Sequence, residues 1–372
     1  MKLRRNRPAV LAGGAVIAAL ALAACSSSTT SAPAATGTTA AGGTTTADAG
    51  PAGTSTASGT LNGSGSTFQL TFQQAAISAF KSVNANMKVN YSGVGSGTGR
   101  ANLAAGTVNF AGSDSPIPSS ETASFNGKKV LYFPVLLGPI ALAYNLSGVT
   151  SLKLTPTLVA NIFQGKITTW NNAEIKSANP GVTLPSTPIT VAVRSDSSGT
   201  TQNFALFLQT AVPSVWTLGS SSTVKWPGTA RAASGNGGVA QVIKSTSGAI
   251  GYVDYTDAKA TGLSMASVQN KAGDFVAPSP AGASAAADGV TVASDLTFHA
   301  VWAAGAAAYP ITYQSWDLVY ATQPNANDAA MLKDYIGYLL GPGQQLLTQL
   351  YYAPLPSSIQ TKAEAQLSQI TS

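Results

Sequence analysis

The sequence predicts an α/β protein built of two lobes. Strand-like and helix-like segments alternate from about Thr60 to the C-terminus. This part of the chain is more than 300 residues long, which is ample for a large core and favours two lobes over one. We find no internal repeat of fixed period in it.

Apolar periodicity assigns the individual elements. Phenylalanine and alanine at helical spacing predict a helix over 68–83, and a long apolar stretch at 130–144 predicts a strand, at least through 142–144. The Ala- and Gly-rich region near 277–289 is interpreted as variable. The remaining expected elements are strands at 60–63, 88–94, 108–113, 189–193, 249–255 and 312–320, helices at 100–105, 157–163, 200–211 and about 238–244, and two closing helices.

Residues 1–24 have the pattern of a secretory signal. Four basic residues precede an uncharged, mostly apolar run that is about 17 residues long, short for a membrane span. The run ends in Leu-Ala-Ala-Cys at 22–25, which resembles the lipobox of bacterial lipoproteins. We therefore expect diacylation of Cys25, which would anchor the protein to the cell membrane on its extracytoplasmic side. An ordinary signal peptide with a chance cysteine is the alternative, and Arg4-Arg5 leaves Sec and twin-arginine export both open.

Residues 25–58 are predicted to form a flexible tether. After Cys25, the only cysteine, they consist almost entirely of Ser, Thr, Ala, Gly and Pro with a single charge at Asp48, so they cannot bury a core. A chain of this kind spans roughly 30 Å. Such a tether suits delivery to a partner in the membrane.

The formal net charge of +6 comes mostly from the signal segment. That segment has four positive charges and no negative ones, which leaves 16 basic against 14 acidic residues and a net charge of +2. No basic stripe or dense lysine and arginine cluster follows residue 25, so nucleic acid is not expected as a partner.

Three turns rich in Gly, Ser and Thr lead from a strand into a helix, at 63–68, 93–99 and 194–200. Glycine lets backbone approach a ligand, and the unpaired N–H groups of a helix start favour an anion. Any one of these turns is ordinary punctuation with a Ser or Thr N-cap, but three that converge would form a cage of neutral donors. The turn at 93–99 is followed by Arg100 and lacks the Gly-Lys-Ser/Thr ending of a P-loop. Thr98 also breaks a Gly-x-Gly-x-x-Gly fingerprint, so nucleotide binding is not expected.

The order and spacing of these turns resemble the phosphate-binding proteins of bacterial high-affinity phosphate ABC transporters, over about residues 59 to 360. The segments that carry the resemblance are Gly-Ser-Gly-Ser-Thr-Phe at 63–68, Tyr-Ser-Gly-Val-Gly-Ser at 91–96, Val-Asn-Phe-Ala-Gly-Ser-Asp at 108–114, Gln-Gly-Lys-Ile-Thr-Thr-Trp-Asn at 164–171, Arg-x-Asp-x-Ser-Gly-Thr at 194–200, Ser-Thr-Val-Lys-Trp-Pro at 222–227 and Gly-Ala-Ile-Gly-Tyr-Val at 248–253. The resemblance implies a two-lobed fold like that of type II periplasmic binding proteins, with crossing strands near 143–145 and 310–313. Lobe I would comprise 59–143 and 312–372, and lobe II 144–311.

The same resemblance implies that the ligand is inorganic phosphate and that no cofactor or metal is needed to hold it. It also implies a monomer that delivers phosphate to the permease and ATPase subunits of a transporter in the membrane. Asp196 would pair with Arg194, so that uncharged donors do most of the holding. Two positions depart from the family pattern. Gly97 has no hydroxyl where many relatives carry a second serine, and Asn236 stands in a loop where some carry an aspartate, which puts any contact from that loop in doubt. The residues implied to contact phosphate are Thr67, Phe68 through its N–H, Ser96, Asp114, Arg194, Ser198, Gly199 through its N–H, and Thr200.

Asp114 is the unexpected member of this set, because a carboxylate repels an anion. Phosphate keeps a proton at neutral pH and can donate a hydrogen bond through it, whereas an ionised carboxylate can only accept a hydrogen bond. Asp114 would therefore accept the P–O–H group of phosphate and reject sulfate. A helix N-cap after the strand at 108–113 is its alternative role.

The competing functional class is an enzyme, with a phosphatase as its sharpest form. The single histidine, His299, lies in an apolar stretch, and we find no cluster with metal-ligand spacing and no Gly-x-Ser-x-Gly turn. A carrier for another oxyanion is the alternative within the binding proteins. Adhesion through the tether and aromatic residues such as Trp170 and Trp226 is a third class, although packing is the expected role of both tryptophans.

Overall fold

A mixed sheet runs through residues 56–372, the part of the chain that the computed structural model describes. The predicted signal segment, Cys25 and most of the predicted tether lie outside the described residues. Within 56–372, no helix is long and apolar enough to cross a membrane. The strands of the sheet are β1 (Gly59–Gly65), β2 (Met87–Gly93), β3 (Phe110–Ser113), β4 (Val130–Tyr144), β6 (Thr190–Arg194), β7 (Arg231–Ala233), β8 (Ala249–Asp254), β9 (Ser264–Met265) and β12 (Thr312–Tyr320).

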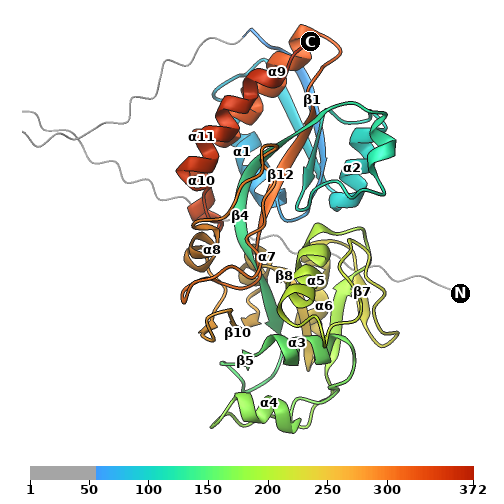
Figure 1. Ribbon diagram of the computed structural model, residues 1–372, viewed down its shortest axis with the longest axis vertical. Helices are drawn as coiled ribbons and strands as arrows, with labels where there is room; N and C mark the ends of the chain where they lie inside the picture. Colours follow the sequence, from blue (N-terminus) through green and yellow to red (C-terminus); the bar gives the residue numbers. More distant parts are fainter. Residues whose placement is uncertain (1–55) are drawn as a thin grey trace, which may run out of the picture. The chain divides into compact units, whose positions relative to one another are not determined.

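The sheet has two halves joined by β4. β4 is the long strand that runs from one half to the other in Figure 1. The strand order of the sheet is β2-β1-β3-β12-β4-β8-β6-β7, with β9 paired to β4. β4 is antiparallel to β12 as far as Pro139 and to β8 from Ile140 onward. Pro139 has no N–H to donate, which suits the change of partner. We call β1, β2, β3, β12 and the start of β4 the first half, and the end of β4 with β6, β7 and β8 the second half.

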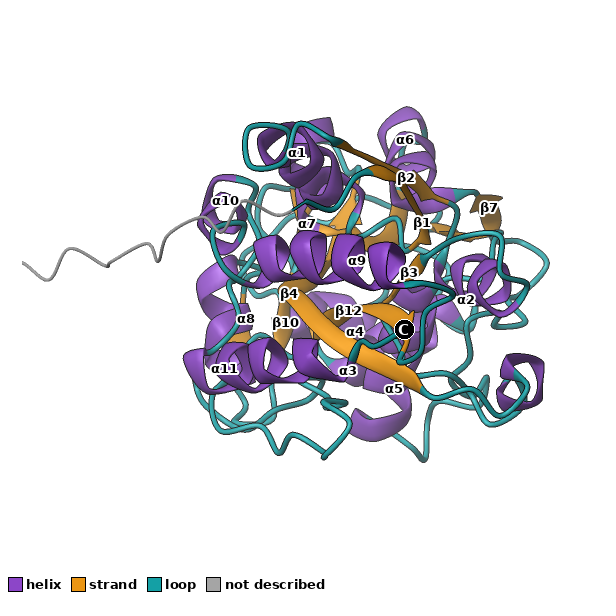
Figure 2. Cartoon of the chain, turned by 90° about the horizontal axis from the view of Figure 1, so that it is seen from above, coloured by secondary structure: helices purple, strands orange, loops and turns teal. Residues whose placement is uncertain are grey.

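Helices surround the strands, as Figure 2 shows. In the first half, α1 packs on β2 and α2 on β1 and β3, while α5 and α6 pack on β8 in the second half. A small separate sheet joins β5 (Lys153–Leu154), β10 (Ser267–Gln269) and β11 (Phe275–Val276). The helices are α1 (Leu70–Phe80), α2 (Ser96–Ala104), α3 (Pro156–Phe163), α4 (Ala173–Ala178), α5 (Gly199–Ala211), α6 (Gly235–Ser245), α7 (Tyr255–Thr261), α8 (Pro280–Ala287), α9 (Ala326–Leu340), α10 (Gln344–Gln349) and α11 (Ser357–Gln366), with 3-10 turns at Thr122–Phe125 and Leu367–Gln369.

Local signals explain where several helices begin. The Thr155 side chain accepts a hydrogen bond from the N–H of Leu158, and Pro156 occupies the first helical position of α3. Ser198 caps α5 in the same way. The apolar run 130–144 forms one strand whose residues are nearly all buried, as expected for a strand covered on both faces.

One expectation about regular structure was wrong and one helix was not predicted. The region 277–289, interpreted as variable, contains α8, because its alanines favour helix and pack closely against β4 and β12. Three helices rather than two close the chain within the described residues, since Gly341, Pro342 and Gly343 separate α9 from α10. The short elements β5, β7, β9, β10, β11, α4 and α7 were not predicted.

Candidate ligand-binding site

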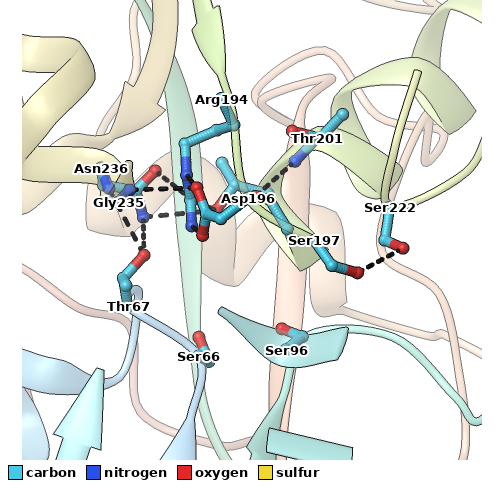
Figure 3. Close-up of polar contacts among 12 residues, drawn as sticks. Ser66, Thr67, Ser96, Arg194, Asp196, Ser197, Thr201, Ser222, Gly235 and Asn236 are labelled. Atoms are coloured by element: carbon cyan, nitrogen blue, oxygen red, sulfur yellow. Dashed lines mark hydrogen bonds and ion pairs between the residues drawn. The ribbon is translucent and has the colours of Figure 1, made fainter. Parts of the chain in front are cut away.

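Polar loops from both halves meet at the carboxyl ends of parallel strands. β1 is parallel to β2 and β3, and β6 is parallel to β7, so the loops that follow them gather on one side of each half-sheet. In Figure 3, Ser66, Thr67 and Ser96 from the first half face Arg194 and Asn236 from the second.

Asp114 follows β3 and is only 1% exposed. Its Oδ2 accepts a hydrogen bond from the Ser96 hydroxyl at 3.2 Å, and its Oδ1 accepts one from Ser315. Burial raises the pKa of Asp114, while the hydroxyls of Ser315, Ser66 and Ser96 and the charge of Arg194 act in the opposite direction. Both carboxylate oxygens are thus oriented as acceptors.

A line of buried polar side chains lies behind Asp114. Gln69 Nε2 donates to Ser315 Oγ at 2.7 Å and to a backbone carbonyl of β12 at 2.9 Å. The Ser315 oxygen is therefore already an acceptor, and its proton points to Asp114. Gln73 extends the line, donating to Gln69 Oε1 and to Asp317 Oδ2, each at 3.0 Å. Burial raises the pKa of Asp317 to about 7.

Arg100 holds the loop that carries Asp114. The fully buried guanidinium donates to the hydroxyls of Ser113 at 3.0 Å and Ser115 at 3.1 Å, on either side of Asp114. Its Nε pairs with Glu121 at 2.7 Å. This ion pair is a scaffold for the acceptor, not a ligand contact.

Arg194 is neutralised by its neighbour Asp196. Its Nε lies 2.8 Å from Asp196 Oδ1, and Nη2 pairs with Oδ2 as the second arm of the fork. Burial alone would raise the pKa of Asp196, but the hydrogen bonds and charge of Arg194 lower it below its usual value. Nη1 faces the hydroxyl of Thr200 at 3.5 Å. The pair brings N–H donors to the site with little net charge.

Asn236 connects the two halves at the site. Its Nδ2 lies 3.2 Å from Thr67 Oγ1 and 3.3 Å from Thr200 Oγ1, and its Oδ1 accepts from Arg194 Nη1 at 3.3 Å. Nδ2 also donates to Asp254 at 3.1 Å. The loop whose contacts the sequence left in doubt therefore brings an amide into the site.

Two helix N-termini point into the same region. α2 begins at Ser96 and α5 at Gly199, and partial positive charge at a helix start favours an anion.

The N–H of Phe68, expected to contact the ligand, donates a hydrogen bond to Ser66 Oγ at 3.1 Å in this structure.

The two halves touch beside the site. The N–H of Gly97 donates to the carbonyl of Ser197 at 3.1 Å, and Asn203 Nδ2 donates to the carbonyl of Asp114 at 2.6 Å. A Cβ added at Gly97 would lie 1.9 Å from Ser197 Oγ. Glycine permits this approach, which gives the departure at Gly97 a packing reason.

The comparisons with known proteins agree on one family. A model for the PBP superfamily domain matches residues 50–342. The phosphate-binding protein PstS of Xylella fastidiosa (strain 9a5c) is 35% identical over 322 residues, which cover 85% of this chain and 86% of that protein. The phosphate-binding protein PstS 2 of Mycobacterium tuberculosis is 33% identical over 84% of this chain and 87% of its own length. The chain belongs to the phosphate-binding protein family.

Solved structures show the same fold. A high affinity periplasmic phosphate-binding protein, PfluDING, bound with phosphate, superposes with a TM-score of 0.70 at 24% identity, covering 83% of this chain and 94% of its own. The phosphate-binding protein from Stenotrophomonas maltophilia gives 0.69 at 20% identity over the same shares. At these identities the likeness concerns the fold. The predicted two-lobed α/β class and the predicted family are both confirmed.

Most residues that sequence analysis placed in the family site lie together. Thr67, Ser96, Asp114 and the segment 194–200 meet across the two halves, and Asp196 pairs with Arg194 as expected. Sequence reasoning missed three polar residues that surround this set, Gln69, Asn203 and Ser315. It placed Ser66 in the first turn without assigning it a role, and it left the contacts of Asn236 in doubt. Asn236 had a detectable signal, since it follows a short strand and starts a helix, like the three glycine-rich turns.

The residues weighed for other functions are exposed or packed among other side chains. His299 is exposed, and within residues 56–372 no three His, Cys, Asp or Glu side chains are grouped as metal ligands. Trp170 is fully buried and donates to the carbonyl of Gly248 at 3.0 Å. Trp226 packs among Phe163, Phe204 and other aromatic rings, which supports the packing role.

Proposed function

We propose that this protein captures inorganic phosphate outside the cytoplasmic membrane and delivers it to the permease and ATPase subunits of an ABC transporter. The observation that carries the proposal is Asp114, a buried acceptor beside Gly199 at the start of α5, where the adjoining Thr200 and its neighbours Arg194 and Asn236 bring donors. A carboxylate accepts a hydrogen bond from the P–O–H group of phosphate, while the other groups donate hydrogen bonds to the remaining phosphate oxygens. The names of the relatives, all phosphate-binding proteins, support the same ligand.

Calorimetric titration of ligand-stripped protein with phosphate, sulfate, molybdate and a phosphate ester tests this proposal. We expect one phosphate bound per chain and no comparable binding of the other anions. Tighter binding of sulfate or molybdate would favour the alternative, a carrier for another oxyanion.

We propose that the protein binds without catalysis. The residues around Asp114 provide hydrogen bonds and a neutralised arginine, which suit retention and release of an intact anion. Incubation with a phosphate ester should release no phosphate. Turnover would identify the protein as a phosphatase instead.

We further propose that 59–143 with 312–372 and 144–311 form the two lobes of a monomer and that phosphate closes them like a hinge. The exchange of partners in β4 at Pro139 and Ile140 and the hydrogen bond from Asn236 to Thr67 support this division. Small-angle scattering should show a smaller radius of gyration with phosphate. Identical radii with and without phosphate would contradict hinge closure.

We propose that Cys25 is diacylated and that residues 25–58 tether the protein to the outer side of the cell membrane. Support comes from the Leu-Ala-Ala-Cys sequence at 22–25 and the uncharged polar segment after it. Cys25→Ser should release the protein from membranes. Membrane association of that variant, without fatty-acid labelling of the native protein, would contradict the anchor.

A further inference from the structure

Tyr313 lies in the strand that passes behind the site. It is the second residue of β12, two positions before Ser315, which donates to Asp114. Alternate residues of a strand share one face, so the Tyr313 side chain leaves β12 on the side of Asp114. Its ring packs on Phe68, with the ring centroids 4.1 Å apart.

The Tyr313 hydroxyl is buried without a hydrogen-bond partner among the described residues. Tyr144 is the other fully buried tyrosine in that part of the chain whose hydroxyl lacks a partner, whereas Tyr309 and Tyr352 each have one. Tyr309 donates to the carbonyl of Ile140 at 2.8 Å and Tyr352 to that of Phe68 at 2.7 Å. A buried hydroxyl without a partner costs free energy, so a partner supplied by a ligand would explain why this one is retained.

The polar groups around the Tyr313 hydroxyl belong to the site. Burial, followed by the charges of Asp114 and Asp254, raises the pKa of Tyr313 well above its usual value, so it remains a donor. The Thr200 hydroxyl lies close enough to lower that pKa without reaching hydrogen-bond geometry.

Both neighbouring carboxylates already have donors of their own. Asp114 accepts from Ser96 and Ser315, and Asp254 accepts from Asn236 and from the N–H of Asp257. The Tyr313 proton is therefore left for a group that lies between these side chains.

We propose that Tyr313 is a further ligand-binding residue, whose phenol donates a hydrogen bond to an oxygen of the tetrahedral oxyanion held between Asp114 and Thr200. The inference rests on the proposed function. The Tyr313 phenol would contribute affinity and not selectivity, because a hydroxyl can donate a hydrogen bond to phosphate and to sulfate alike. Selection between the two anions stays with Asp114.

The test is calorimetry of the full-length protein, purified in detergent and stripped of ligand, with inorganic phosphate. Tyr313→Phe removes only the hydroxyl and keeps the ring on Phe68. A lost hydrogen bond to an anion weakens binding by about 10- to 100-fold. Tyr144→Phe is the matched control, because the Tyr144 hydroxyl is also buried without a partner in the described residues but lies near Ser264 and Trp170. The control should bind phosphate like the wild type.

Two further variants separate the possible failures. Tyr313→Met fills the space with a flexible apolar side chain and replaces the Phe variant if that one does not fold. Thr200→Val removes a hydroxyl of the proposed site. Wild-type affinity in a folded Tyr313 variant, with weakened binding in Thr200→Val, would overturn the role of Tyr313 alone. Unchanged affinity in Thr200→Val would overturn the proposed site and this inference with it.

Discussion

Asp114 and Arg194 come from different halves of the candidate site, and they differ in whether a neighbouring opposite charge neutralises them. Arg194 is paired in a fork with Asp196, so its side of the site contributes N–H donors with little net charge. Among residues 56–372, Asp114 contacts no such counter-ion, and the hydroxyl donors around it keep both of its oxygens as acceptors. The difference separates two tasks: the Arg194 side holds an oxyanion, and the Asp114 side selects one that brings a proton.

Removal of the Arg194 guanidinium should have the largest effect on affinity. Arg194→Ala takes away the fork donors and leaves Asp196 uncompensated beside the anion, at a cost of about 3–5 kcal/mol, or about 10²- to 10⁴-fold in Kd. Calorimetry with phosphate measures it. Arg231→Ala is the control, because Arg231 is exposed and its side chain bonds only to Thr246 among the described residues. Equal affinities of the two variants would break the division of tasks.

Asp114→Asn should change selectivity more than affinity. The Asn amide can donate to either anion, so sulfate binding should improve and the phosphate-to-sulfate affinity ratio should fall by about 10²-fold or more. Competition calorimetry at fixed ionic strength measures the ratio, with exposed Asp274→Asn as the control. A ratio that stays at the wild-type value in a folded variant would remove the selective role of Asp114.

Loss of the close contact between Gly97 and Ser197 should weaken phosphate binding less than loss of the Arg194 charge, and should change selectivity less than loss of the Asp114 charge. Gly97→Ala places a Cβ 1.9 Å from Ser197 Oγ and 2.6 Å from its Cβ, so the halves must separate slightly. Overpacking of this kind costs about 1–3 kcal/mol, and we expect roughly 10-fold weaker phosphate binding. Gly228→Ala adds a Cβ with nothing within 4 Å and should bind normally. Normal binding by Gly97→Ala would show that the close approach is not needed.

The buried line behind Asp114 should affect stability more than binding. Burial raises the pKa of Asp317 to about 7, whereas an unfolded aspartate titrates near about 4. The folded protein binds the extra proton, so stability should decline as pH rises from about 4 to about 7 and then level off. Asp317→Asn should flatten this decline by on the order of 1–4 kcal/mol in urea unfolding. An unchanged pH profile would mean that Asp317 does not titrate in the folded state.

The sequence predicted those parts of the site that depend on local chemistry. Glycine-rich turns with Ser or Thr caps mark helix starts whatever the tertiary structure, so Ser96 and the segment 194–200 were found from their own neighbours. Ser315 and Gln69 could not be found in this way. Their partners are more than 200 residues away in the chain, and only the pairing of β12 with β3 brings them to Asp114.

The departure at Gly97 shows the same limit from the other direction. The family pattern that the sequence resembles implies a missing hydroxyl there, whereas the structure shows that a side chain would meet Ser197 of the other half. Asn236, whose contacts the sequence analysis left in doubt, connects Thr67 with Thr200. Contacts across the two halves were the least predictable part of the site, because they depend on how the halves meet.

The most direct test of the account is the phosphate-to-sulfate affinity ratio of the wild-type protein, measured beside that of Asp114→Asn at about pH 8. Burial raises the pKa of Asp114, so an alkaline pH favours its ionised form, which only accepts hydrogen bonds. Phosphate still has a proton to donate at this pH and sulfate has none. We predict strong preference for phosphate in the wild-type protein and a much lower ratio in Asp114→Asn. Sulfate binding as tight as phosphate binding in the wild type, or equal ratios in the two proteins, would contradict selection by Asp114.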